Sequence, residues 1–356
     1  FWPILNNPQV DTLVSIGIIL LLMTVNILGV RESSRLNIFF IIVDIGTQIT
    51  LIVLGIILIL AVNPGVLKEH IFGAGNWPAP QNLVYGIAIA ALCFTGVETV
   101  SQLAEETKKP AAQIPRTYIL MIIIVLVLFA GISLVALSSM TPQMLGDPVN
   151  GWARDPVAGI AASLPSATLR GIFAPLVAIL AASILLTAAN AGLLGISRLA
   201  YNLSSHQQLP VLFGRVHQRF HTPYFSIAFF CCLSIVLLLP GFSNPRFFEQ
   251  LGALYVFGSL LCFALAHLAI IFLRIRKPDL PRPFKIRGNI KIHGRKLPIT
   301  GIVGFLTTLI IWIIVIINQP FSRWAGIAWM AIGLVIYLLF RYFLQRSKKR
   351  NKYEVK

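Results

Sequence analysis

Runs of about twenty apolar residues recur along the whole of this sequence, and they constrain its fold more than any other feature. An α-helix rises about 1.5 Å per residue, so roughly twenty residues cross the ~30 Å of hydrocarbon in a bilayer. Because 57% of the residues are hydrophobic and only 12% are charged, lipid is the expected solvent for most of the chain. The sequence therefore predicts an all-α integral membrane protein.

We expect one transmembrane domain over residues 1–344 and a basic tail over residues 345–356. The chain opens with Phe1 instead of methionine and shows no signal peptide, so we expect its true N-terminus to be missing. The nine predicted helices are 11–30, 36–61, 81–103, 117–140, 168–200, 223–241, 249–273, 298–318 and 324–344.

The distribution of lysine and arginine over the connections predicts the orientation of the chain. With these helices, 24 of the 29 basic residues fall on one side, and cytoplasmic loops carry such an excess. The C-terminus is therefore predicted to be cytoplasmic, in the cell membrane. Nucleic acid is not an expected partner, because the charge lies between apolar runs and not on one face. The basic tail is interpreted as a topology signal, with binding of anionic lipid headgroups as the alternative.

The third predicted helix, 81–103, contains two residues that are costly inside a membrane. Gly96 weakens a helix, and the carboxylate of Glu98 is expensive at membrane depth unless it faces a cavity or a pathway. Together they predict an unwound segment at residues 95–97, whose freed backbone groups can line a substrate site. The alternative is a small-residue packing contact at Gly96 and an interfacial position for Glu98.

The sequence around this segment resembles a known family. Residues 94–98 read Phe-Thr-Gly-Val-Glu, followed by Glu-Glu-Thr-Lys-Lys-Pro and Ile-Pro-Arg. This order resembles the sixth helix and following loop of the amino acid-polyamine-organocation (APC) permeases. Residues 26–37, 197–210 and 276–284 resemble, in order, the junction of the fourth and fifth helices, the end of the eighth and the exit of the tenth. The resemblance covers almost the whole chain and implies that it holds helices four to twelve.

The resemblance implies a LeuT-type inverted-repeat transporter fold, in which the broken first and sixth helices share the substrate. The first helix, absent here, would hold the carboxylate of an amino acid, so the N-terminal helices of the same protein are expected partners. The sixth helix would hold the amine. Leucine at position 92, where some relatives place a large aromatic residue, favours a small neutral or apolar amino acid. The substrate-binding positions implied in this helix are Leu92, Cys93, Phe94, Thr95 and Gly96.

The resemblance also implies residues for ion coupling. Glu98 matches an acidic position that is frequent in the family and takes part in proton-linked gating. Asp44 falls where several proton-coupled relatives carry a lysine that mimics a bound sodium ion, so this sequence reverses the charge there. Asp44 could bind a proton itself or hold Na⁺ with hydroxyls of the eighth helix, for which Ser183 and Thr187 are candidates. A buried, protonated Asp44 bonded to a neighbouring helix is the alternative.

Two other polar residues inside apolar runs are interpreted as structural. Gln48 is predicted to be an interhelical hydrogen-bond partner. His267 is predicted to be a packing residue, although a lone histidine inside a span can also serve as a proton relay.

The leading hypothesis is secondary active transport of an amino acid or related amine by alternating access, coupled to H⁺ or Na⁺ and requiring no other cofactor. Two alternatives stay open, namely a K⁺ transporter on the same fold and an amino acid sensor that does not transport. A membrane enzyme is not expected, because the sequence contains no intramembrane His cluster or Ser-His pair, no His-Glu-x-x-His motif and no nucleotide-binding loop.

Overall fold

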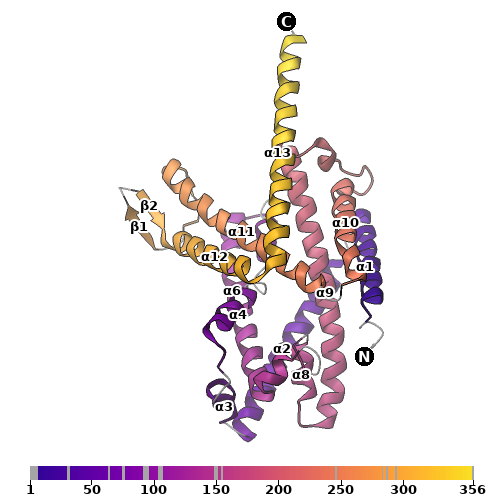
Figure 1. The fold of residues 1–356 in the computed structure, drawn as a ribbon, viewed down its shortest axis with the longest axis vertical. Helices are drawn as coiled ribbons and strands as arrows, with labels where there is room; N and C mark the ends of the chain where they lie inside the picture. Colours follow the sequence, from indigo (N-terminus) through magenta and orange to yellow (C-terminus); the bar gives the residue numbers. More distant parts are fainter. Residues whose placement is uncertain are drawn as a thin grey trace. The chain divides into compact units, whose positions relative to one another are not determined.

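The computed structural model describes residues 7–29, 33–62, 65–73, 77–90, 96–102, 107–147, 151–153, 155–244, 247–282, 284–285, 288–292 and 295–354. Helices dominate these residues (Figure 1). The long helices are α1 (Pro8–Leu28), α2 (Ser33–Val62), α6 (Pro110–Ser139), α9 (Ala167–Ser205), α10 (Tyr224–Leu238), α11 (Phe247–Arg276), α12 (Ile299–Asn318) and α13 (Pro320–Glu354). The short elements are α3 (Val66–Phe72), α4 (Pro80–Ala90), α5 (Thr99–Gln102), α7 (Pro142–Gly146), α8 (Pro156–Ala162), the 3₁₀ helices η4 (Val211–Gly214) and η5 (Leu239–Phe242), and the strands β1 (Asn289–Ile292) and β2 (Arg295–Pro298).

Proline begins many of these helices. Its fixed φ suits the first helical turn, where the amide that proline lacks would have no partner within the helix. Side-chain caps add to this at α1 and α8, where Asn7 accepts from the amide of Gln9 and Asp155 accepts from the amide of Ala158. Such caps contribute about 1 kcal/mol each to helix stability. The helices that begin with proline are α1, α4, α6, α7, α8 and α13.

The chain divides into two compact units, which are described separately. One comprises Val30–Ala79 and Gln113–Ala191, and the other comprises Phe1–Gly29, Pro80–Ala112 and Gly192–Lys356. The first is called the α2–α6 unit below, and the second the α11–α12 unit.

Two glycines allow α2 and α6 to cross closely in the α2–α6 unit. A Cβ atom built on Gly55 of α2 would lie 2.4 Å from the side chain of Val135, and one built on Gly131 of α6 would lie 2.7 Å from that of Ile52. Small residues bring membrane helices together so that they gain van der Waals contact over a long surface. Leu51 and Val135, both fully buried, lie at the centre of the resulting apolar cluster.

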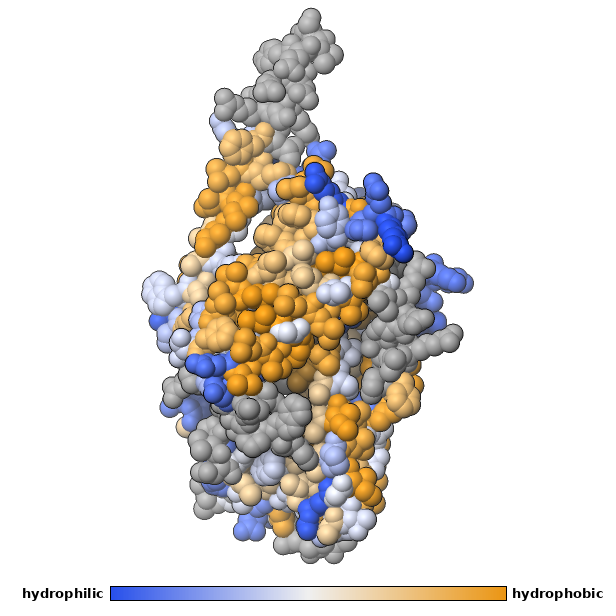
Figure 2. Space-filling model, turned by 90° about the vertical axis from the view of Figure 1, so that its right-hand side faces the viewer, coloured by the Kyte–Doolittle hydropathy of each residue, from blue (hydrophilic) through white to orange (hydrophobic). Residues whose placement is uncertain are grey.

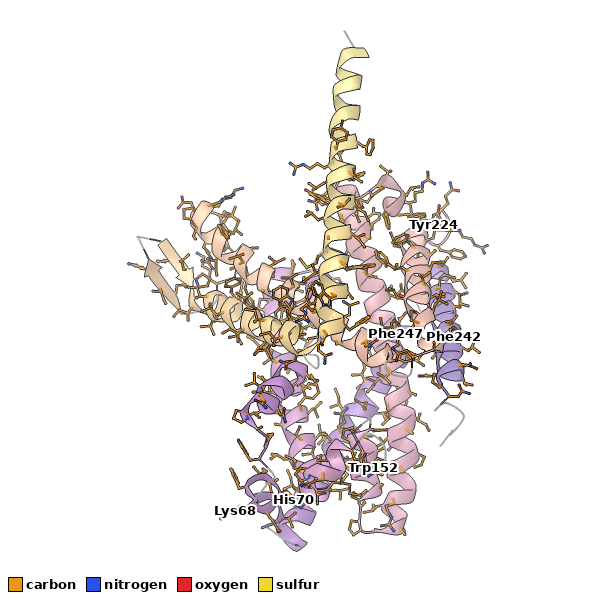
Figure 3. The ribbon with its side chains drawn as sticks, in the orientation of Figure 1. Lys68, His70, Trp152, Tyr224, Phe242 and Phe247 are labelled. Atoms are coloured by element: carbon orange, nitrogen blue, oxygen red, sulfur yellow. The ribbon has the colours of Figure 1, made fainter. Side chains whose placement is uncertain are left out.

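Short helices cover the end of the α2–α6 unit where α6 finishes. The Nδ1 atom of His70 in α3 lies 2.5 Å from the carbonyl oxygen of Leu137, which belongs to the last turn of α6. Trp152 packs on Gly159 of α8, because a Cβ on that glycine would come within 2.6 Å of the indole. Figure 3 labels Lys68, His70 and Trp152 in this region. These contacts satisfy a helix-terminal carbonyl and partly bury an aromatic ring.

Phe257 organises the packing of α11, α12 and α13 in the α11–α12 unit. Its ring lies 5.3 Å from that of Trp312 in α12, and the indole nitrogen of Trp312 donates to the carbonyl oxygen of Phe257 at 3.1 Å. Gly326 of α13 leaves room for the same ring, since an added Cβ would approach it to 2.5 Å. Phe257 is 2% exposed, so three helices share one buried aromatic side chain.

A second helix pair in this unit consists of α1 and α10, which Figure 1 shows side by side. The hydroxyl of Thr222, just before α10, donates to the carbonyl oxygen of Ile27 in α1 at 2.8 Å. Gly29 ends α1 in the left-handed conformation, at φ 66°, which glycine adopts without steric cost. Next to this pair, η5 leads towards α11, where Figure 3 labels Phe242 and Phe247.

The surface agrees with the prediction of a membrane protein. Large apolar side chains lie exposed along the long helices, for example Leu185 at 70% and Ile317 at 65%, and Figure 2 shows broad hydrophobic areas. Water would penalise such surfaces, whereas lipid does not. Seven helices of the described residues are long and apolar enough to cross a bilayer, namely α1, α6, α9, α10 with η5, α11, α12 and α13. The protein is therefore a multi-pass, mostly helical membrane protein, with the short β1–β2 hairpin as an addition to the predicted all-α fold.

The count of nine crossings stays a prediction. In α2 the described apolar stretch is Ile41–Ile57, and the described part of α4 is Pro80–Ala90, so neither is among the seven. Most predicted boundaries differ from the observed helices by a few residues, and two differ by more. The predicted helix 117–140 begins at Pro110, because proline starts a helix well. The predicted helix 324–344 continues to Glu354, because the basic tail consists of residues with good helix propensity and contains no glycine or proline.

Candidate functional site

The predicted interruption of the third helix is present in the structure. Helix α4 is described as Pro80–Ala90, and α5 begins at Thr99 after a turn that includes Gly96, Val97 and Glu98. Gly96 has φ 93°, a conformation that residues with a Cβ atom avoid. A glycine in this sequence position therefore permits the break. The predicted substrate-binding residues Leu92, Cys93, Phe94 and Thr95 lie outside the described residues.

The carboxylate of Glu98 bonds to the backbone of the interrupted segment. Its Oε2 atom accepts a hydrogen bond from the amide of Gly96 at 2.8 Å. An amide outside a helix in an apolar span needs such a partner, because an unpaired buried N–H costs several kcal/mol in lipid by order of magnitude. The acceptor here is charged when Glu98 is ionised, which strengthens the bond. Glu98 thus bonds an ionisable side chain to the interrupted backbone, which is where the resemblance implies substrate binding.

Helix α5 restarts directly from Glu98. The amide of Ser101 donates to the carbonyl oxygen of Glu98 at 3.0 Å, and the Ser101 hydroxyl donates to the same oxygen at 2.6 Å. The sequence analysis did not select Ser101, although a serine three residues after a helix break commonly bonds back to it. Gly96, Val97 and Glu98 are partly buried, and α12 packs along α4, which leads into the break.

A second ionisable group, Asp44, lies within α2 and leaves that helix unbroken. Its Oδ2 atom accepts a hydrogen bond of 2.6 Å from Nε2 of Gln48, one turn further along. The prediction that Gln48 bonds to another helix is wrong for this contact, because residues four apart lie on the same face of a helix. Between them, the hydroxyl of Thr47 donates to the carbonyl oxygen of Val43 at 2.8 Å. The Asp44–Gln48 pair is thus a local polar site on an otherwise apolar helix.

Ser183 and Thr187 also stand one turn apart, on the part of α9 that belongs to the α2–α6 unit. The Ser183 hydroxyl donates to the carbonyl oxygen of Leu180 at 2.9 Å, and the Thr187 hydroxyl donates to the backbone carbonyl oxygen of Ser183 at 2.9 Å. Each hydroxyl therefore has its hydrogen occupied and its oxygen lone pairs available to a cation. No hydrogen bond joins either residue to Asp44 among the described residues, so their shared cation site stays a prediction.

The described ranges contain no group of three His, Cys, Asp or Glu side chains that could hold a metal ion. A cation near Asp44 would therefore depend on carboxylate, amide, hydroxyl and carbonyl oxygens, which are the ligands that hard cations prefer.

His267 packs between helices, as the sequence analysis predicted. Its imidazole lies against Gly304 of α12, where an added Cβ would come within 2.5 Å of the ring. A glycine opposite a histidine allows α11 and α12 to approach closely around a ring that would otherwise hold them apart. The contact gives His267 a packing role, and its use as a proton relay is left untested by it.

Comparison with known proteins shows the family to which the chain belongs. The profile of the amino acid permease family matches residues 3–340. The chain belongs to this family, and the predicted APC permease fold is confirmed.

Several curated transporters are similar to this chain at low identity. It is 28% identical over 332 residues to the branched-chain amino acid permease BcaP of Bacillus subtilis (strain 168), covering 91% of this chain and 62% of that protein. It is 26% identical over 337 residues to the methylthioribose transporter of the same organism, covering 91% and 63%. With the large neutral amino acids transporter small subunit 2 of Rattus norvegicus it shares 25% identity over 353 residues, covering 94% and 58%. The chain thus spans about three fifths of the length of these relatives.

Proposed function

We propose that this chain is the larger part of a secondary active transporter for an amino acid, which works by alternating access. The observation that carries the proposal is the interrupted helix at Gly96, with the Glu98 carboxylate bonded to the backbone of the break. Irregular backbone at membrane depth is tolerated where it lines a cavity, and transporters use it to bind substrates. Membership of the amino acid permease family and the transporter relatives support the same function.

The proposed substrate class is a neutral, apolar amino acid. Leu92 takes the place of the large aromatic residue of some relatives. The backbone carbonyl of Thr95 is the proposed acceptor for the amino group of the substrate. Two relatives are named for branched-chain and for large neutral amino acids, which supports an apolar side chain. Another is named for methylthioribose, so this sugar belongs among the competitors in any test.

Glu98 is the proposed link between proton binding and the substrate. Ionised, its carboxylate holds the amide of Gly96 at 2.8 Å. Protonation removes the charge that strengthens this bond, so the interrupted segment is held less firmly. Because the same segment carries the proposed substrate contacts, a proton and an amino acid would each favour one conformation of it, which is the thermodynamic requirement for coupling.

Asp44 is proposed as a second coupling group. Its carboxylate can take up a proton or bind Na⁺, with the oxygens of Ser183 and Thr187 as further ligands in the cation case. Gln48 already supplies one donor to the carboxylate, which orients it. A proton would be held by Asp44 alone, whereas Na⁺ would need the hydroxyls of Ser183 and Thr187 in α9. Removing these hydroxyls should therefore impair coupling to Na⁺ but not coupling to H⁺.

The proposed orientation places the C-terminus in the cytoplasm of a cell whose plasma membrane holds the protein. The asymmetric distribution of lysine and arginine supports it. A reporter that fluoresces only in the cytoplasm, fused after Lys356, tests this directly. Fluorescence is expected, and activity of a periplasmic or extracellular reporter at the same position would overturn the orientation.

Uptake into proteoliposomes tests the transport proposal. The full reading frame around this chain is reconstituted, and labelled leucine, alanine, lysine and methylthioribose are supplied with an inward proton gradient, an inward Na⁺ gradient or neither. Accumulation of a neutral amino acid under one gradient is the expected result. Flux of rubidium without amino acid transport would favour the K⁺ alternative. Saturable amino acid binding without uptake or exchange would favour a sensor.

A further inference from the structure

The β1–β2 hairpin places two lysines directly opposite each other. The strands pair antiparallel, and Lys291 of β1 faces Lys296 of β2 across the ladder. Side chains in such a pair have Cβ atoms about 5 Å apart, and like charges at this distance destabilise the hairpin. The pair is therefore costly for the hairpin alone.

Lys291 and Lys296 define a cationic face of the hairpin, and by register the opposite face is made by Ile290, Ile292, Arg295 and Leu297. Because side chains alternate along a strand, the neighbouring pair of Ile290 and Leu297 lies on the face opposite the lysines. Leu297 is 8% exposed, and β2 packs along α11 and α12, whereas both lysines are exposed. Leu297 thus anchors the hairpin to the helices, whereas Ile290 is 43% exposed and both lysines are presented outward.

The hairpin lies at the end of a membrane-spanning helix. β2 ends at Pro298 and α12 begins at Ile299, with no residue between them. The amide of Ile299 also donates to the carbonyl oxygen of Gly288 at 3.2 Å, which ties the start of the helix to the segment before β1. Figure 1 shows the two strands beside the beginning of α12 and the end of α11. The lysines are therefore within reach of lipid headgroups, which border the hydrocarbon that α12 crosses.

The cationic face has no acidic partner within the described part of the chain. Residues 274–298 carry nine basic side chains and one acidic residue, Asp279. Neither Lys291 nor Lys296 forms an ion pair with a described residue. Arg282, by contrast, is used internally, because its guanidinium donates to the carbonyl oxygens of Lys277, Pro278 and Leu280. The charge of the lysine pair remains available to an outside anion.

We propose that the β1–β2 hairpin binds the phosphate group of an anionic phospholipid between Lys291 and Lys296. A phosphate between two ammonium groups turns their repulsion into two attractive contacts, and lysine is a common phosphate ligand. The lipid belongs to the leaflet from which α12 starts, which the charge distribution predicts to be the cytoplasmic one. This site is separate from the broken helix and does not depend on the transported substrate.

Native mass spectrometry of the full-length protein, delipidated and titrated with phosphatidylglycerol or phosphatidylcholine, tests the proposal. The K291Q/K296Q double variant removes the pair. The K108Q/K109Q double variant is the matched control, because it removes two exposed lysines from a different connection on the same predicted side. We expect K291Q/K296Q to weaken the tightest phosphatidylglycerol binding by about tenfold or more. The control should lose at most about twofold, and phosphatidylcholine binding should not change.

Lys291→Glu separates lipid binding from hairpin folding. The substitution places opposite charges across the ladder, so it stabilises the hairpin while it removes the anion site. We expect phosphatidylglycerol binding to be lost although the thermal stability is unchanged or higher. Wild-type lipid affinity in Lys291→Glu, or equal losses in both double variants, would overturn the proposal. Displacement of the lipid by millimolar inorganic phosphate would also overturn it, because the site would then select a free anion.

Discussion

Two carboxylates lie inside predicted spans, and they affect their helices in opposite ways. Glu98 bonds to a backbone amide, that of Gly96, in a segment that has left the helix. Asp44 bonds to a side-chain amide, that of Gln48, and α2 continues through it. The difference lies in the partner, because a glycine at positive φ frees backbone groups that need an acceptor, whereas an intact helix has none to offer. An acidic residue in a span therefore marks a backbone site only where the helix can open.

The surroundings of the two helices strengthen this contrast. In α2, the turns after Asp44 pack tightly on α6 through Gly55 and Gly131, which keeps the helix regular. At Gly96 an added Cβ would meet no atom of the described residues within 4 Å, so among these residues its positive φ, and not crowding, opposes a side chain. The same residue type thus serves packing in one helix and backbone conformation in the other.

Gly96→Val should have the largest effect on activity. A β-branched residue at φ 93° costs about 1–3 kcal/mol, which corresponds to a loss of up to about 100-fold in the population of the interrupted conformation. We expect the initial rate of neutral amino acid uptake into proteoliposomes to fall to a similar extent. Gly46→Ala in α2 is the matched control, because Gly46 is helical and faces open space. That variant should keep its uptake rate within about twofold and gain up to about 1 kcal/mol of stability.

Equal losses of uptake in Gly96→Val and Gly46→Ala would contradict the contrast between the two helices. If size-exclusion chromatography showed a loss of folded Gly96→Val protein, the lower uptake would come from misfolding and not from a change at the interrupted helix.

Two substitutions of Glu98 should separate hydrogen bonding from charge. Glu98→Gln retains an oxygen that can accept from the Gly96 amide, whereas Glu98→Ala retains none. A bond to a charged group contributes about 1.5–3 kcal/mol, so Glu98→Ala should weaken substrate binding by at least about tenfold. Glu98→Gln should bind within a few-fold of the wild type but lose proton-driven accumulation. Calorimetric binding and gradient-driven uptake measure the two effects, and identical behaviour of the variants would contradict a role for the Gly96–Glu98 hydrogen bond.

Asp44→Asn should preserve the helix and remove the coupling. Asparagine offers an oxygen to Gln48, so the contact and the fold should persist. Net accumulation against a gradient should disappear, while exchange of internal for external amino acid continues. The comparison with Ser183→Ala and Thr187→Ala then distinguishes the ions, because only Na⁺ coupling needs the hydroxyls. Undiminished accumulation in Asp44→Asn would remove Asp44 from the mechanism.

Gly55→Ala should affect stability and not transport chemistry. The added methyl group would lie 2.4 Å from the side chain of Val135, an overlap that costs about 1–3 kcal/mol in a packed interface. A lower melting temperature in detergent is expected. Val135→Ala in the same chain should restore part of it by making room. If the double variant is as unstable as the sum of the single ones, α2 and α6 do not cross at these residues in solution.

The break in the third predicted helix could be predicted from residue types alone. Glycine and glutamate two residues apart inside an apolar run are costly in a helix, and that cost pointed to the break at Gly96. The hydrogen bond from the Gly96 amide to Glu98 could not be predicted, because it depends on the side-chain rotamer and on φ at the glycine. Gln48 shows the same limit, since the sequence could not decide between a partner on its own helix and one on another.

The sequence by itself determined that this protein lies in a membrane as a bundle of helices, because about twenty apolar residues in succession have no other stable environment. It also determined the family, through short motifs in a fixed order. Only the tertiary structure decided the role of individual polar and small residues. Gly55, Gly96 and Gly304 are chemically identical, yet one lies in a helix crossing, one opens a helix and one makes room for His267. Their roles depend on neighbours that are distant in sequence and on the backbone angles at each site, which residue type does not specify.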